Sequence, residues 1–336
     1  MEKSVEDWKV LVADNSAVMG RLIKKYLVDL GLKGENITLA GDGNQASMIT
    51  ELMPFDLVTA GRHMKNKDGL ELLQDIRSHN KEQIRGVKYL MISADGSPQL
   101  MADILSAGAN GLLTKPFHPE DLQETLNRLG ELTNGGFVCL NDNERQAAKS
   151  GGAEEADDAG AGGQVVPEGL VRVFVKCAVE GLGQYMVMAT PGSHKDAGEP
   201  VGDLLSSIEI TDEKLGIGMT LSLLFPKQAA CTIYETLFGE VDTEMVCGIV
   251  GELNNIIAGA VKPMLAGMET ACHQFLFPDK EPLAPGAEFR LQLGFPECRW
   301  LSAGDKSGET GGEADFTVPF ELDQGRLYLS LKLHPA

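Results

Sequence analysis

The chain has 336 residues, the length of about two ordinary domains. Its 49 acidic and 29 basic residues leave a formal net charge of −20, and a surface of that sign repels nucleic acid and anionic membranes. A hydrophobic content of 43% excludes wholesale disorder. We see no signal-peptide pattern, no apolar run near the length of a membrane helix, and six scattered cysteines without a C-x-x-C pair. We therefore expect a cytoplasmic protein with reduced thiols and no membrane or nucleic-acid partner.

Residues 6–135 alternate short apolar runs with helical patterns, which predicts a first domain of the α/β class. We expect strands at 10–13, 37–40, 56–60, 89–93 and 111–114. The helical patterns cover 16–30, 44–52, 68–78, 98–107 and 119–130. Continuous apolar runs separated by helices are typical of parallel strands covered on both faces. The expected fold is a doubly wound parallel sheet whose functional edge lies at the carboxyl ends of its strands.

The composition changes sharply at residues 141–163, NDNERQAAKSGGAEEADDAGAGG, where almost nothing can be buried. Such a segment cannot offset its ordering entropy, so we predict a flexible acidic linker rich in Gly and Ala. A second low-complexity stretch at 302–314 lies between strand-like segments and is expected to be an exposed loop. The linker therefore separates two domains.

Residues 165–336 show a different pattern, in which strands lie on both sides of a pair of helices. We expect helices at 169–182, 226–238 and about 242–267, and strands near 205–211, 217–224, 286–294, 315–322 and 326–333. The last two strands flank Asp323-Gln324-Gly325, which is typical of a hairpin. This order predicts an α+β domain with helices packed on a mostly antiparallel sheet.

Four segments of the first domain carry a recognisable motif set: VLVADNSAVMGRLI, FDLVTAGRHMKNKDGLELL, YLMISADG and GLLTKPF. Together they resemble a CheY-like response-regulator receiver domain along its whole length. The resemblance implies a flavodoxin-like fold and a pocket in which two acids hold Mg²⁺, an aspartate accepts a phosphoryl group, and a hydroxyl and a lysine complete the site. In this sequence the matching positions are, in that order, Asp14, Asn15, Gly61, Ser93 and Lys115.

The receiver-like pocket is degenerate at its acceptor. Glycine offers no oxygen nucleophile, and one Asp beside one Asn makes a weak Mg²⁺ site. We therefore predict a receiver that is not phosphorylated at Gly61, and a retained Asp14–Lys115 pair that keeps the pocket shut. His63 is expected to be a loop histidine and no substitute acceptor, and Asp56 precedes a strand and does not end one.

The segment 242–266, DTEMVCGIVGELNNIIAGAVKPMLA, combines an apolar helical stripe with an unusual opposite row. That row is Gly248, Glu252, Asn255 and Gly259, at helical spacings of 4, 3 and 4. A solvated face normally carries Lys and Glu, whereas this row places one acid and one amide between glycines, each of which costs about 1 kcal/mol of helix propensity. From spacing alone, a functional face and a structural one both stay open.

The helix sequence GELNNIIAGAVK resembles the signature helix of the CheC/CheX/FliY phosphatases, E-x-x-N followed by 22 residues and a proline. Glu252 and Asn255 match that pattern, and Pro278 lies at the required offset. A single E-x-x-N helix is closest to the CheX type. The resemblance implies dephosphorylation of an aspartyl phosphate on a partner response regulator that brings its own Mg²⁺. Asn255 would orient the attacking water, Glu252 would pair with the partner's lysine, and this chain needs no cofactor.

Two functions follow as alternatives. The first is an aspartyl-phosphate phosphatase in bacterial chemotaxis or two-component signalling, with the first domain as a non-phosphorylated docking or regulatory module. The second is a non-catalytic scaffold or adaptor in such an assembly. In either case the first domain would bind what a true receiver binds, such as a histidine kinase, or another receiver, and exposed edge strands in the second domain allow a homodimer. A nucleotide or metal enzyme is disfavoured because there is no Walker loop and no H-E-x-x-H motif.

Overall fold

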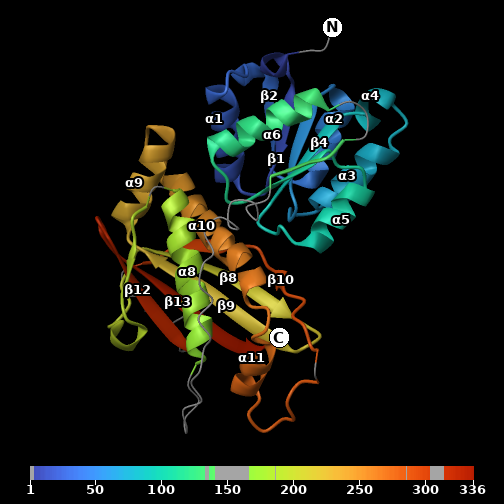
Figure 1. Cartoon of the computed structure of the whole chain (residues 1–336). Coiled ribbons are helices and arrows are strands. Elements are labelled where there is room, and N and C mark those ends of the chain that lie inside the picture. The colour runs from blue at the N-terminus through green and yellow to red at the C-terminus, as the bar shows by residue number, and fades with distance from the viewer. Residues whose placement is uncertain (1–3, 133–135, 141–165, 186, 285, 303–313) are drawn as a thin grey trace. The chain divides into compact units, whose positions relative to one another are not determined.

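The computed structural model describes residues 4–132, 136–140, 166–185, 187–284, 286–302 and 314–336. The chain divides into two compact units, Met1–Gly152 and Ala153–Ala336, and each unit contains its own sheet (Figure 1). The predicted linker at 141–163, and most of the predicted loop at 302–314, lie outside the described residues.

The first unit is built on a parallel sheet of six strands in the order β2-β1-β3-β4-β5-β6. The strands are β1 (Val10–Ala13), β2 (Ile37–Ala40), β3 (Leu57–Gly61), β4 (Lys88–Ser93), β5 (Gly111–Thr114) and β6 (Val138–Leu140). Every residue of β1 and β3 is buried, as expected for strands covered on both faces. The predicted doubly wound α/β sheet is therefore confirmed. The sheet also includes β6, which lies beyond the predicted domain boundary at residue 135. This strand was not predicted, because a run of three residues is too short for its pattern to be recognised.

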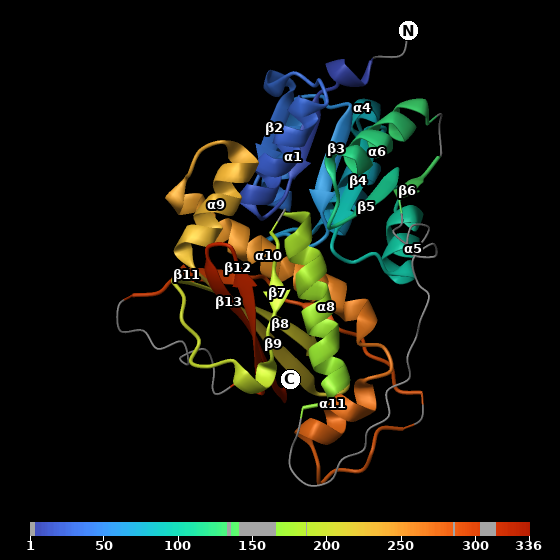
Figure 2. The same cartoon turned by 60° about the vertical axis from the view of Figure 1, so that its left-hand side comes forward.

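Helices flank this sheet on both sides (Figure 2). They are the 3₁₀ turns η1 (Val5–Asp7) and η2 (Gly34–Asn36), and the helices α1 (Ala17–Asp29), α2 (Gly43–Leu52), α3 (Gly69–Ser78), α4 (Glu82–Arg85), α5 (Pro98–Ser106) and α6 (Pro119–Glu131). Side-chain caps set several of the starts: Ser16 accepts from Met19 N, Asp42 accepts from Gln45 N, and Asp68 forms a capping box with Glu71. The single-turn helix α4 was not predicted.

The second unit contains an antiparallel sheet in the order β10-β8-β9-β13-β12-β7, with β11 also paired to β8. The strands are β7 (Thr190–Pro191), β8 (Leu204–Asp212), β9 (Ile217–Phe225), β10 (Gln292–Leu293), β11 (Glu297–Trp300), β12 (Phe316–Leu322) and β13 (Gly325–Pro335). The β12–β13 hairpin forms as predicted, with Leu322 opposite Gly325, whose φ is 114°. The strand predicted at 286–294 is wrong in extent. Only β10 forms there, and Pro296, which cannot donate to a ladder, precedes the separate β11.

The helices of the second unit are α8 (Glu168–Gln184), the 3₁₀ turn η3 (His194–Asp196), α9 (Lys227–Phe238), α10 (Thr243–Met264) and α11 (Glu269–Leu276). Helix α9 ends at Gly239, whose φ of 79° is the left-handed conformation that glycine adopts at helix ends. Helix α10 is central, because it contacts α8, α9, β8, β9 and β11. The predicted α+β arrangement, helices on a mostly antiparallel sheet, is therefore confirmed, and α11 is an addition to it.

Helix α10 alone, among the residues that the structure describes, is long and apolar enough to cross a membrane by length and composition. The sequence analysis expected no such run. The most apolar window has a mean hydropathy of 1.3, and 67% of it is buried inside the protein. A core helix meets the same criterion, because packing against a sheet and two other helices also demands apolar side chains.

The close approach of two backbone segments at Gly69 generates a stability prediction. A Cβ built on Gly69 would lie 2.3 Å from the carbonyl oxygen of Gly61, so we expect Gly69→Ala to destabilise the first unit by about 1–3 kcal/mol. Gly20→Ala in α1 is the matched control, because outside its chain neighbours and the adjacent backbone of α1 no described heavy atom lies within 4 Å of its Cβ, and alanine favours the helix by up to about 1 kcal/mol.

The measurement is urea unfolding followed by the fluorescence of the buried Trp8, in a Trp300→Phe background that leaves Trp8 as the single tryptophan. Equal unfolding free energies for the two alanine variants would contradict this account of the backbone packing.

Candidate functional site

The carboxyl edge of the first sheet collects the residues that the receiver-like motifs singled out. Asp14 and Asn15 follow β1, Gly61 ends β3, Ser93 ends β4 and Lys115 follows β5. Parallel pairing aligns these strand ends, since Ala13 lies opposite Ala60 and Ser93 opposite Thr114. All five positions therefore lie together at the edge where doubly wound sheets place their sites, and we call this group of residues the pocket.

A buried ion pair occupies this pocket. The Lys115 Nζ donates to Asp14 Oδ2 at 3.0 Å, and the two side chains are 5% and 2% exposed. Asp14 Oδ1 accepts from the Ser16 amide at 2.9 Å, so both oxygens of the carboxylate are engaged. Ser93 is also used, because its Oγ accepts from Asp95 N at 3.0 Å and its carbonyl accepts from Lys115 N at 2.6 Å. The charges of the pocket are thus largely neutralised within the unit.

Position 61 faces this ion pair. A Cβ built on Gly61 would lie 3.3 Å from Asp14 Oδ2 and 3.7 Å from Met64 Cγ, which is a tight fit. Any longer side chain at this position would extend beside the Asp14 carboxylate. Glycine therefore removes the oxygen nucleophile and also relieves the pair of a second anion nearby.

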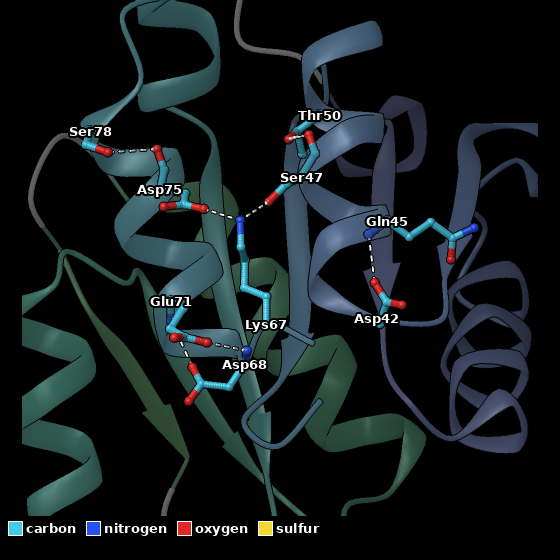
Figure 3. A network of polar contacts seen from close by, with 9 residues as sticks. All are labelled: Asp42, Gln45, Ser47, Thr50, Lys67, Asp68, Glu71, Asp75 and Ser78. Atoms are coloured by element: carbon cyan, nitrogen blue, oxygen red, sulfur yellow. Dashed lines mark hydrogen bonds and ion pairs between the residues drawn. The ribbon is translucent and has the colours of Figure 1, made fainter. Parts of the chain in front are cut away.

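The loop after Gly61, residues 62–68, is anchored to the two helices beside it (Figure 3). Lys67 Nζ donates to Ser47 Oγ in α2 at 3.0 Å and pairs with Asp75 in α3. Asn66, whose φ is 65°, donates to Asp42 at 2.9 Å. His63 is exposed on this loop. These contacts hold the loop at both flanks and limit how far the backbone near Gly61 can move.

Tyr89 in β4 anchors Gly69, the residue that follows this loop and begins α3. Its hydroxyl donates to the carbonyl oxygen of Gly69 at 2.7 Å. Complete burial raises the pKa of Tyr89 well above its usual value, so the phenol keeps the proton that this hydrogen bond needs. The sequence reasoning did not single out Tyr89, because a tyrosine in an apolar strand looks like any other core residue.

In the second unit, α10 carries the other candidate residues. Glu252 is 3% exposed and Gly259 is buried, whereas Asn255 and Gly248 are partly exposed. Two residues of the predicted row are therefore buried within the unit, and two are partly exposed. Because α10 contacts two helices and three strands of its own unit, little of its circumference stays fully exposed. Pro278, the third matching position, is exposed just beyond α11.

The two adjacent asparagines of α10 have different surroundings. Asn254 is fully buried, and its Nδ2 donates to Ser206 Oγ and to the Leu221 carbonyl oxygen, each at 3.2 Å. Its Oδ1 has no hydrogen-bond partner within the part of the chain that is described. Successive residues of a helix differ by about 100°, so Asn255 points away from the sheet that Asn254 contacts. The sequence reasoning missed Asn254, although its place in the apolar stripe with Val250 and Ile257 was a usable signal.

Across the described ranges, no group of three or more His, Cys, Asp or Glu side chains is arranged to hold a metal ion. Asp14 is the sole carboxylate among the five pocket positions, and it is engaged with Lys115. The oxygen ligands that Mg²⁺ requires are thus sparse in this pocket.

Comparison with known proteins identifies the first unit. Residues 10–127 match the response regulator receiver domain family. Chemotaxis protein CheY-3 of Vibrio cholerae is 32% identical over 126 residues, which cover 38% of this chain and 94% of that protein. Through its first unit, this chain belongs to the response regulator receiver family. In this receiver domain a glycine ends the third strand, and the lysine after the fifth strand pairs with Asp14.

Two solved structures are also similar in part. Chemotaxis protein CheX from Vibrio vulnificus shares 18% identity, covers 49% of this chain and 99% of its own, and gives a TM-score of 0.37. A chain of the CheX-CheY-BeF3-Mg complex from Borrelia burgdorferi shares 26% identity, covers 36% of this chain and 87% of its own, and gives a TM-score of 0.33. These values do not assign a function to the second unit. Any function proposed for that unit has to be argued from its own residues.

The buried pair of the receiver domain generates a second stability prediction. Lys115→Met leaves the Asp14 carboxylate buried without its cation, which we expect to cost about 3–5 kcal/mol. The double variant Asp14→Asn, Lys115→Met removes both charges and should be clearly less destabilised. Lys25→Met is the control, because the Lys25–Asp29 pair is exposed and its loss should cost less than about 0.5 kcal/mol. Trp8 fluorescence during urea unfolding provides the measurement. A double variant as unstable as Lys115→Met alone would contradict the argument.

Proposed function

We propose that the second unit dephosphorylates an aspartyl phosphate on a partner CheY-like response regulator, in the cytoplasm of a bacterium and in chemotaxis or two-component signalling. The observation that carries the proposal is the pairing of Glu252 and Asn255 on α10. They are three residues apart, so their Cβ atoms are neighbours at about 5–6 Å, and glycines 248 and 259 flank them. Glycine at the partly exposed position 248 lets the backbone of a partner approach closely.

The chemistry needs an attacking water, a phosphorus centre and a leaving carboxylate. The amide of Asn255 can accept a hydrogen bond from the water and donate one to a phosphoryl oxygen, which holds the water in line with phosphorus. Water then attacks, the P–O bond to the partner's aspartate breaks, and the products are inorganic phosphate and a free carboxylate. Since phosphoryl transfer depends mostly on positioning and electrostatics, no covalent intermediate on this chain is needed.

Glu252 would set the register of docking. A receiver that carries a phosphoryl group brings its own Mg²⁺ and its own lysine, and the carboxylate of Glu252 can pair with that lysine. Because Glu252 is 3% exposed, the attraction of a lysine brought against it would be poorly screened by solvent. This chain supplies no metal of its own under this mechanism.

The rigidity of α10 supports the proposal. The helix begins at Asp242, which accepts from Glu244 N, and it is held against the sheet by the two hydrogen bonds of Asn254. A catalytic side chain on a helix anchored in this way loses little conformational entropy when it meets its substrate.

We infer that the receiver domain is a non-phosphorylated docking or regulatory module. Gly61 has no oxygen to accept a phosphoryl group, and Asp14 is already paired with Lys115. Its partners would be those of a true receiver, a histidine kinase or a second receiver, and a homodimer stays part of the proposal. A non-catalytic adaptor is the second candidate function, and Gly61 favours it because one module of the chain lacks the chemistry of its family.

The two asparagines of α10 provide a matched test of the phosphatase. Asn255→Ala should lower kcat by about 100-fold, as when a positioning group is removed, and change stability by less than about 0.5 kcal/mol. Asn254→Ala should do the reverse, costing about 1–3 kcal/mol of stability while the folded fraction keeps its kcat. Glu252→Gln should mainly raise KM. The assay is phosphate release from a panel of phosphorylated receivers, with unfolding followed in parallel. Native turnover by Asn255→Ala would refute the catalytic role.

The receiver domain allows a separate test. With acetyl phosphate and Mg²⁺, the native chain should gain no phosphoryl group within residues 1–135, including Asp14, Asp56 and His63. Gly61→Asp should gain little, since Asn15 lacks a metal-binding carboxylate and the new one would lie beside Asp14. Adding Asn15→Asp should raise the yield above that of Gly61→Asp alone. Intact mass and peptide mapping provide the measurement, and a stoichiometric phosphoryl group on the native domain would contradict this assignment.

A further inference from the structure

The second unit contains a cavity of about 610 Å³ where the first turns of α10 meet β11. Its lining includes Lys227, Glu244, Cys247, Cys298 and Arg299. Two of the six cysteines of the chain therefore share one opening, and the proposed phosphatase mechanism uses neither of them.

The two thiols are in contact. Cys247 and Cys298 are joined by a side-chain hydrogen bond, and both are partly exposed. Gly251 lies one turn after Cys247 on the same side of α10, and a Cβ built on it would lie 3.9 Å from the Cβ of Cys298. Helix α10 and strand β11 are therefore in direct contact beside the two thiols.

The other described cysteines lack this arrangement. Burial raises the pKa of Cys177 and of Cys272 to about 12, which leaves both as inert core thiols. Cys177 Sγ contacts Met264 Sδ at 3.5 Å, and a thioether cannot form a disulfide. Cys139 and Cys231 are partly exposed but do not line the cavity.

We propose that Cys247 and Cys298 are a redox-active dithiol, which an anionic low-molecular-weight disulfide of the glutathione type oxidises to a reversible disulfide within the chain. The assignment of the oxidant rests on charge. The ammonium of Lys227 and the guanidinium of Arg299 line the cavity with one carboxylate, Glu244, so cations outnumber anions there in a chain of net charge −20. Carboxylate groups on the oxidant would complement this excess.

Burial first, and then the bond to Cys247, raise the pKa of Cys298. In the exchange that we propose, Cys247 is the attacking sulfur and Cys298 the resolving one. The Cys247 thiolate breaks the S–S bond of the oxidant, releases one thiolate and forms a mixed disulfide. Cys298 then loses its proton to solvent, attacks Cys247 Sγ and releases the second thiolate. The chain loses two electrons and two protons, and the oxidant becomes two thiols.

The crosslink would fix β11 against the turn of α10 that precedes Glu252. Oxidation would in this way stiffen the start of the helix without changing Glu252 or Asn255 themselves. This proposal does not depend on the phosphatase, since the thiol chemistry can be measured without a phosphorylated partner.

The test uses the full chain in buffers of reduced and oxidised glutathione, quenched in acid and alkylated. The oxidised protein should lose two alkylatable thiols out of six and yield one crosslinked peptide pair containing Cys247 and Cys298. Dithiothreitol should restore both thiols. Cys298→Ser should stop at a mixed disulfide on Cys247, Cys247→Ser should form no crosslink, and Cys231→Ser should behave like the native chain. Absence of the crosslink in the native chain, or its persistence in Cys298→Ser, would overturn the proposal.

Two further measurements test its details in the folded protein. In a Trp8→Phe background, the emission of Trp300, which also lines the cavity, should fall on oxidation because a nearby disulfide quenches an indole. The crosslink should form faster with glutathione disulfide than with the cationic disulfide cystamine, and Lys227→Gln should slow the glutathione reaction by a factor of about 2 to 5. Equal rates with the two disulfides would overturn the assignment of an anionic oxidant.

Discussion

The arrangement of the second unit depends on one buried amide, that of Asn254. It lies within the apolar stripe of α10 and donates to two strands, to Ser206 in β8 and to the Leu221 carbonyl in β9. Apolar contacts alone would let the helix slide or rotate by small steps at little cost, whereas the two hydrogen bonds of this amide form in one register only. That register sets the positions of Asn255 and Glu252. It also sets the contact between Cys247 and Cys298.

The first unit depends on a different polar interaction, a buried ion pair at the carboxyl edge of its parallel sheet. Asp14 and Lys115 satisfy each other, and both are shielded from water. An ion pair of this kind adds little net stability compared with apolar residues, but it strongly disfavours loss of either partner alone. That coupling explains, in physical terms, why Asp14 and Lys115 occur together at an edge where a glycine ends β3.

Most of the fold could be predicted from the sequence, because a long periodic pattern of apolar residues depends little on any single residue. The parallel runs of the first unit, the β12–β13 hairpin and the helices α8, α9 and α10 all have extended periodicity. Apart from α11, which has eight residues, the missed helices and strands are short: α4, β6, β7 and β11 span two to four residues each, and tertiary pairing decides them. Motif spacing also predicted that Asp14, Ser93 and Lys115 lie at one edge of the sheet. It could not separate Asn254 from Asn255, or pair Cys247 with Cys298, because both depend on how α10 is rotated against its sheet.

The short strands β7, β10 and β11 have a consequence for self-association. Each end of the second sheet is covered by segments of only two to four residues. Proline interrupts both ends, since Pro191 lies in β7 and Pro296 lies between β10 and β11. An incoming strand would therefore find few consecutive amide and carbonyl groups to pair with, and none at the prolines can donate. These short, proline-containing segments disfavour open-ended strand addition at the residues that they cover.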